Sequence, residues 1–185
     1  MTEQAATEPV GTDPAPTDRI VADQLSTREA VRTALASAEL EWEQPDDDTF
    51  VVELPGERKL KTVCSLVVGA HSLSVNAFVV RRPDENVEAV HRWLLERNAK
   101  AYAVAYAVDA LGDVFVVGRL PLHAVTPDEV DRVLGSVHEL ADGAFNTLLE
   151  LGFSSAIRKE WAWRTARGES TANLAAFAHL APPEN

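Results

Sequence analysis

Two consecutive runs of alternating apolar residues between positions 60 and 79 constrain the fold more than any other feature of the sequence. The first run places one face at Leu60, Thr62, Cys64, Leu66 and Val68, and the second at Leu73, Val75, Ala77 and Val79. A period of two residues is that of a β-strand. Because Gly69, Ala70 and His71 supply a turn between the runs, the pattern predicts an antiparallel hairpin.

The same stretch carries no charge from Thr62 to Val80, and its 19 residues are enough for a membrane helix. Polar and small residues interrupt it, however, and its alternation favours two strands, so we expect no membrane segment. The first eight residues lack the basic and apolar regions of a signal peptide. A single cysteine, Cys64, also suits a reducing compartment, and we therefore expect a cytoplasmic protein.

Helical and strand patterns alternate around this hairpin. We expect helices over 20–40 (with a break near Ser26), 86–98, 126–151, 155–166 and 171–180, and further strands over 50–54, 102–108 and 114–120. Thr126-Pro127-Asp128-Glu129 is a strong helix start, since threonine caps and proline suits the first helical position. Large residues and alanines alternate over 102–108, which predicts a central strand with its alanine face against a helix.

This order predicts an α+β fold with an antiparallel sheet of about five strands, in the sequence α-β-β-β-α-β-β-α, followed by a C-terminal helical extension. Residues 1–18 hold four acids, no base and three prolines, and predict a disordered acidic tail. Residues 19–152 then form the α+β domain, and 153–185 an extension that packs on it. Helices on one side of such a sheet leave the other side for the tail helices or for a second copy of the chain.

Charge and motifs exclude several function classes. With 17 basic and 29 acidic residues the chain has a net charge of −12, which argues against binding nucleic acid through phosphate contacts. One cysteine excludes an internal disulfide and a cysteine-rich zinc site. Glycine-rich phosphate loops and nucleophile elbows are absent. We therefore expect no enzyme activity and no cofactor.

The reactive side chains that remain have simpler interpretations. Cys64 lies on the apolar face of its strand, which predicts a buried structural thiol. The pair Glu88 and His91 has the spacing of a di-iron helix, but that chemistry needs two such motifs and further glutamates. The aspartates at 46–48 and the pair Asp109 and Asp113 are typical of turns. No metal site is predicted.

One segment differs from the rest of this acidic chain. Residues 157–168 carry a local charge of +3 and two of the four tryptophans. Arginine and tryptophan dominate binding hot spots, so the segment is a candidate contact site for an acidic or extended partner. The candidate residues are Arg158, Lys159, Trp161, Trp163, Arg164 and Arg167. In the alternative interpretation, Trp161 packs the helix down and the bases face water or pair with acids between Glu41 and Glu57.

Several strings of the sequence resemble the actinobacterial branch of the YbjN-domain proteins. They are LPGERKLKT at 54–62, SLVVG at 65–69, VGRLPL at 117–122, NTLLELGF at 146–153 and IRKEW at 157–161. The resemblance extends over about residues 26–180. It implies a fold like that of type III secretion chaperones, which are usually dimers that hold an extended protein segment. The family is also described as sensory-transduction regulators, and it brings no catalytic residues.

Three hypotheses for the function follow. The first is a non-enzymatic protein-binding module, chaperone-like or an adaptor, that holds partner segments along an exposed sheet edge or face, and we expect it to be a homodimer. The second is a regulatory module that binds a small ligand, which a deep pocket with convergent polar groups favours. The third is an enzyme of unrecognised type, which requires ionisable groups clustered in a cleft.

Overall fold

Six antiparallel strands form one sheet in the order β1-β2-β3-β4-β6-β5 in a computed structural model that describes residues 16–182. The strands are β1 (Glu41–Asp46), β2 (Thr49–Pro55), β3 (Lys61–Val68), β4 (Ser72–Val80), β5 (Val104–Val108) and β6 (Val114–Pro121). The predicted hairpin is confirmed as β3 and β4, with the Gly69 N–H donating to the Ser72 carbonyl oxygen over 2.9 Å.

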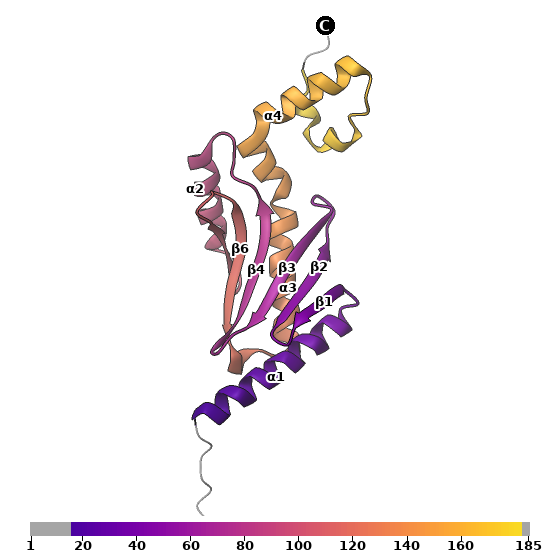
Figure 1. Cartoon of the computed structure of the whole chain (residues 1–185). Coiled ribbons are helices and arrows are strands. Elements are labelled where there is room, and N and C mark those ends of the chain that lie inside the picture. Colours follow the sequence, from indigo (N-terminus) through magenta and orange to yellow (C-terminus); the bar gives the residue numbers. More distant parts are fainter. Residues whose placement is uncertain (1–15, 183–185) are drawn as a thin grey trace, which may run out of the picture.

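Four α-helices accompany the sheet, with shorter turns between them (Figure 1). They are α1 (Pro16–Ser37), α2 (Val87–Asn98), α3 (Pro127–His138) and α4 (Phe145–Arg167), with 3₁₀ turns at η1 (Leu122–Ala124) and η3 (Ala172–Leu180) and a π turn at η2 (Glu139–Gly143). The start of α3 is as predicted: Thr126 Oγ1 accepts the Glu129 N–H over 3.2 Å. The predicted α+β class is confirmed.

The core lies between the sheet and these helices. Alternate strand residues face it, and Phe50, Leu66 and Val116 are fully buried there. α1 contributes Val31 and Leu35 to the same core. α1 and α3 contact each other, and Figure 1 shows α3 behind β2 and β3. One face of the sheet is therefore closed, and no described helix lies over the other.

Several predicted elements are corrected. The strand β1 was not expected, so the sheet has six strands and not five. The strand predicted as central, β5, is an edge strand, and its alanines lie on the uncovered face and not against a helix. α1 shows no break at Ser26. The helix predicted over 126–151 is interrupted by the π turn at 139–143, and α4 continues through Gly152 to a kink at Phe153.

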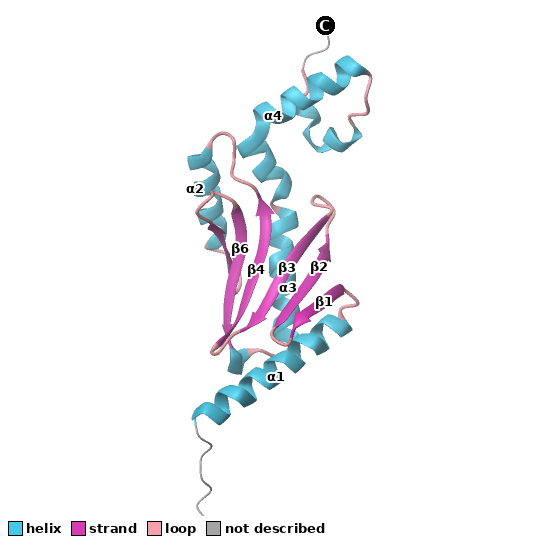
Figure 2. Cartoon of the chain, in the orientation of Figure 1, coloured by secondary structure: helices cyan, strands magenta, loops and turns pink. Residues whose placement is uncertain are grey.

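Both ends of the described part of the chain, the start of α1 and the segment after Phe153, extend away from the sheet. Of the predicted tail, residues 1–15 lie outside the described residues, and 16–18 form the first turn of α1. Beyond the kink, the second half of α4 and η3 project past the end of the sheet (Figure 2). Ile157, Phe177 and Leu180 form a small core there, against which Leu149 packs. We call residues 154–181 the arm.

Candidate protein-binding surface

The uncovered side of the sheet, which we call the open face, is poor in charge across its central strands. Its outward side chains are Val51 on β2; Val63, Ser65 and Val67 on β3; Ser74, Asn76 and Phe78 on β4; and Phe115, Val117 and Arg119 on β6. The exposed fractions are 45% for Val63, 37% for Val67 and 42% for Phe78. A hollow of about 460 Å³ lies between β4 and β6, lined by Ser74, Asn76 and Val117 among others.

An aromatic pair with a cation beside it marks one end of this face. The Phe78 and Phe115 rings meet edge to face with centroids 5.5 Å apart. The Lys59 ammonium lies 5.3 Å from the Phe78 centroid and 6.0 Å from that of Phe145, and it donates to the Phe78 carbonyl oxygen. Burial lowers the pKa of Lys59, although Asp142 opposes that shift. The lysine therefore joins the loop before β3 to the end of β4.

Asp142 fixes that loop from the helical side. Its Oδ1 accepts the N–H groups of Arg58 and Lys59, each over 2.8 Å, and its side chain is 4% exposed. Burial acts to raise the pKa of this carboxyl, but the backbone N–H donors outweigh burial and hold the pKa below its ordinary value. A Cβ on Gly56 would lie 2.4 Å from the same oxygen, so only glycine fits there.

The two edges of the sheet are unequal. At β5, the side chain of Asn98 acts as a short strand: its Oδ1 accepts the Tyr106 N–H over 2.7 Å, and its Nδ2 donates to the Tyr106 carbonyl over 3.2 Å. At β1, Pro45 lacks a backbone donor and the register with β2 shifts between Glu43 and Asp46. Both edges of the sheet thus have features that disfavour hydrogen bonding with a further strand.

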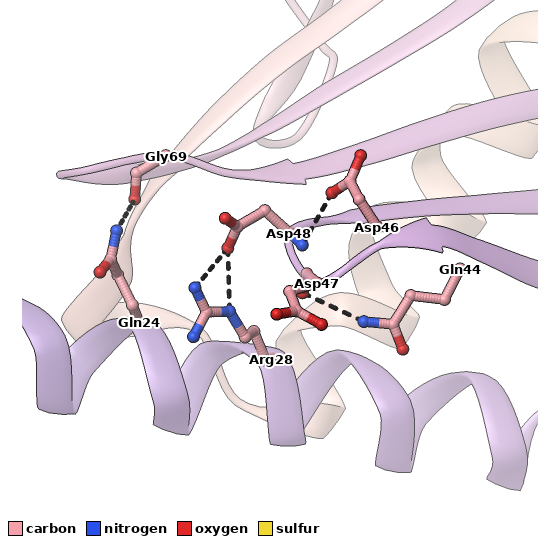
Figure 3. A network of polar contacts seen from close by, with 7 residues as sticks. All are labelled: Gln24, Arg28, Gln44, Asp46, Asp47, Asp48 and Gly69. Carbon is pink, nitrogen blue, oxygen red and sulfur yellow. Dashed lines mark hydrogen bonds and ion pairs between the residues drawn. The ribbon is translucent and has the colours of Figure 1, made fainter.

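A polar network attaches α1 to the turns at one end of the sheet (Figure 3). Arg28 Nε and Nη2 donate to Asp48 Oδ1 over 2.8 and 2.6 Å. The Asp46 carboxylate accepts the Asp48 N–H over 2.9 Å, which confirms the predicted turn at 46–48. Gln24 Nε2 donates to the Gly69 carbonyl over 3.1 Å. The Arg28 bonds thus hold the acidic β1–β2 hairpin against α1, and the Gln24 bond holds the β3–β4 turn there.

A tight joint sets the direction of the arm. A Cβ on Gly152 would lie 2.9 Å from the Pro83 Cβ, so glycine allows the chain segments to approach. Just beyond the kink, the Glu85 carboxylate accepts the Ser155 N–H over 2.6 Å and its Oγ–H over 2.8 Å, and these bonds lower the Glu85 pKa. The Arg81 guanidinium stacks 4.5 Å from the Phe153 ring centroid.

The structure separates the six predicted contact residues of the arm into two groups. Arg164 is bonded to other residues of the arm, since its Nε donates to Glu160 over 2.6 Å and its Nη1 to the Ser170 carbonyl over 3.1 Å. Trp161 is half-buried. The other four, Arg158, Lys159, Trp163 and Arg167, are exposed. The Arg167 guanidinium lies 4.6 Å from the Trp163 ring centroid, so these two side chains form one unit.

Chemical groups suited to catalysis are not gathered on the described residues. Cys64 is buried as predicted, and burial raises the pKa of its thiol to about 12, which keeps it protonated. Within residues 16–182, no group of three or more histidine, cysteine, aspartate or glutamate side chains could hold a metal ion. None of the helices in this range has the length and apolar content needed to cross a membrane.

Sequence reasoning expected an exposed sheet face but did not identify the residues that form it, and it missed the bond between Asp142 and the loop at 55–60. The apolar residues of the open face were visible as Val63, Val67 and Phe78, but they alternate with an equally apolar set, so the pattern alone did not distinguish the two faces. Asp142 lies 83 residues from Lys59 in the chain, and no local motif indicates their contact.

Comparison with known proteins gives a family and close relatives. The model of the YbjN family, described as "Putative bacterial sensory transduction regulator", matches residues 27–150. An uncharacterised protein of Mycobacterium tuberculosis is 52% identical over 162 residues, covering 85% of this chain and 88% of the relative. One of Mycobacterium leprae is 58% identical over 135 residues, or 73% of each chain.

Two solved structures are similar at low identity. The first is the crystal structure of the ExsC–ExsE complex, with a TM-score of 0.45, 19% identity, and coverage of 72% of this chain and 96% of the solved chain. The second is the heterodimeric ExoU–SpcU complex from the type III secretion system of Pseudomonas aeruginosa. Its TM-score is 0.46 with 18% identity, covering 65% of this chain and 96% of the solved chain.

Proposed function

The chain belongs to the YbjN family, and from that premise and the surface described above we propose that it is a non-enzymatic protein-binding module, which takes up an extended apolar segment of a partner protein on the open face of its sheet. The proposal concerns the face rather than the edges. Its partner chemistry is that of a short run of apolar and small polar side chains.

The composition of the open face carries the proposal. An antiparallel sheet with one solvated face ordinarily alternates apolar inward and polar outward residues. Here the outward residues of β3, β4 and β6 include Val63, Val67 and Phe78, which expose more than a third of their surface, and half-buried Phe115 and Val117. Contiguous exposed apolar surface of this kind is typical of interaction sites. Ser65, Ser74 and Asn76 lie among these residues and offer hydrogen bonds to a bound backbone.

The edges are less suited to strand addition. A partner strand at β5 has to displace Asn98 from the Tyr106 backbone groups, and one at β1 meets Pro45 and the irregular register beside it. The exposed carboxylates of Glu41 and Glu43 also line that edge. Binding on the face leaves all of these contacts in place.

Charge on the margins of the face gives the partner segment a direction. Glu41, Glu43 and Glu53 lie on the β1–β2 side, whereas Arg119 lies on β6. Glu53 is paired with Lys61 over 2.6 Å, which leaves Glu41 and Glu43 as the free charges. We therefore expect a segment with basic residues on the β1 side and apolar residues over β3, β4 and β6.

The alternative of a regulatory module for a small ligand gains no support from the hollows described. The hollows on the described residues that come nearest to pockets, at β1, at α2, beside Asp142 and on the open face, are all partly open to solvent, and none is an enclosed cavity. A ligand site ordinarily encloses most of its ligand.

A photo-crosslinking amino acid placed at position 63 tests the proposal in living cells that express the full chain. We expect it to capture a discrete partner, and a synthetic peptide of the captured segment to bind the purified protein by calorimetry. Leu95, 69% exposed on α2, gives the matched control position. Equal capture from positions 63 and 95 would contradict the proposal.

A second variant tests the face by affinity. Val63→Asp and Val67→Asp together place two carboxylates on the open face, where both side chains are exposed and little packing is lost. We expect peptide binding to weaken at least about tenfold, since charged groups on an apolar contact remain unpaired and desolvated. Unchanged peptide affinity in a folded variant would place the contact elsewhere.

A further inference from the structure

Trp163 and Arg167 form an exposed knob near the end of α4. Trp163 is 45% exposed, and the Arg167 guanidinium stacks against its ring with 4.6 Å to the centroid. Lys159 and Arg158 are exposed on the same helix. Within the described residues, no carboxylate lies within 4.0 Å of any of these three cations, whereas Arg164 is already paired with Glu160. The knob thus combines an aromatic plane with unsatisfied positive charge.

A hollow of matching chemistry lies beside β1. Its volume is about 390 Å³, and it is lined by the apolar residues Leu40, Pro55 and Leu60 together with Glu39, Glu41, Glu53 and Lys61. Leu60 is 89% exposed and lies beside Leu40 and Pro55 in the lining of the hollow. Residues 39–48 carry six acids and no base, and Glu39, Glu41 and Glu43 have no ion pair within the described residues.

Knob and hollow do not contact each other within one chain, since Trp163 stays 45% exposed and Leu60 89% exposed. The hollow lies where β1 begins and β2 passes to β3, at the same end of the sheet from which the arm projects (Figure 1). The joint formed by Gly152, Pro83 and Glu85 fixes the arm in this direction. The arm also leans toward the side of the sheet that ends in β1.

We propose that the knob of each protomer seats in the acidic hollow of a second copy of this chain, so that two reciprocal contacts form a two-fold dimer. A two-fold axis makes any contact between two separate patches occur twice, which doubles its contribution. The Trp163 ring lies against Leu40, Pro55 and Leu60, and the Arg167 and Lys159 cations face Glu39 and Glu41.

Charge complementarity selects a second copy as the occupant. Two chains of net charge −12 repel each other, so association requires a local contact of opposite sign. Residues 157–168 of the arm, at +3, form such a region, and the chain itself supplies an acidic, partly apolar counterpart of suitable chemistry. The dimer contact and the proposed partner segment share Glu41, but Val63, Val67 and Phe78 on the open face are not part of the dimer contact, so the Val63→Asp/Val67→Asp variant tests partner binding separately.

Charge reversal with complementation tests the dimer on the full chain by sedimentation equilibrium. We expect wild type to dimerise, and the arm variant Lys159→Glu/Arg167→Glu and the hollow variant Glu39→Lys/Glu41→Lys each to be monomeric. Mixed in equal amounts, the two variants are expected to associate one to one. Arg92→Glu/Lys100→Glu changes the net charge by the same amount as the arm variant does, at exposed positions in α2 and just after it. It is the matched control for the arm variant.

Trp163→Ala separates the aromatic contribution from charge. Loss of a hot-spot tryptophan raises a dissociation constant by at least about thirtyfold, and the side chain is exposed, so the chain stays folded by circular dichroism. A monomeric wild type overturns the proposal. So does a dimer that survives both reversals, which places the interface elsewhere, or a failure of the two folded variants to associate on mixing.

Discussion

The closed and open faces of the sheet come from the same strands, yet the described helices cover only one of them. On the closed face Phe50 and Leu66 are fully buried under the helices, whereas on the open face Val63 and Phe78 expose 45% and 42% of their surface. The side chains on the two faces are of similar apolar types, and the faces differ in whether helices pack over them. Apolar alternation therefore predicts that a strand forms, but the helices decide which of its two faces stabilises the fold and which remains available for contact.

Matched phenylalanine substitutions give the largest expected difference between the two faces. Phe50→Ala removes a fully buried ring that packs 6.0 Å from Trp42, and we expect a loss of about 3–5 kcal/mol in the free energy of unfolding. Phe78→Ala removes an exposed ring from the open face, with an expected loss of about 1 kcal/mol. Urea unfolding of the two variants measures both values, and equal losses would contradict the comparison.

Asp142 gives the second largest effect, and it acts from the closed side on the loop that borders the open face. Asp142→Ala leaves the N–H groups of Arg58 and Lys59 without their shared acceptor, and we expect a loss of about 2–3 kcal/mol. Asp131→Ala, on an exposed position of α3, is the control for loss of a carboxylate.

The same carboxyl predicts a pH dependence. Its pKa is lower in the folded protein than the ordinary 3.8, so the folded state binds its proton less tightly than the unfolded chain does. The stability it contributes is complete above pH values near 3.8 and is lost as the pH falls through the lower, folded pKa. Acid titration of stability should therefore fall less steeply in Asp142→Ala than in wild type. Parallel acid curves would show that the bonds to Arg58 and Lys59 contribute little.

The features that the sequence predicted are those with local causes. The β3–β4 hairpin follows from alternation and the turn at Gly69, the start of α3 from Thr126 and Pro127, and the buried thiol of Cys64 from its position in a strand. The fold class followed from the order of such segments. Each of these depends on residues within a few positions of one another.

The features that sequence reasoning missed depend on contacts between distant segments. β1 contains Pro45 and several acids, which disfavour a strand, and it forms through pairing with β2 beside the Arg28–Asp48 bond from α1. The tryptophans and bases of the arm were visible, but the pairing of Arg164 with Glu160 and the seating of α4 against Pro83 were not. Sequence composition indicated that the arm was unusual. Only the fold distinguished its exposed bases from Arg164, which is paired with Glu160.

Asn98 gives the smallest expected effect and tests whether its side chain protects the β5 edge of the sheet from pairing with another strand. Asn98→Ala removes two hydrogen bonds to the Tyr106 backbone, and water can replace them at this exposed edge, so we expect a loss of about 1 kcal/mol. The freed N–H and C=O groups then border the apolar residues of β6, which favours edge-to-edge pairing. We therefore expect sedimentation velocity to detect species larger than those of wild type, increasing with concentration. Asn86→Ala, which loses one bond to the Leu151 carbonyl away from the edge, is the control. If both variants sediment as wild type does, Asn98 stabilises the end of α2 and does not protect the edge.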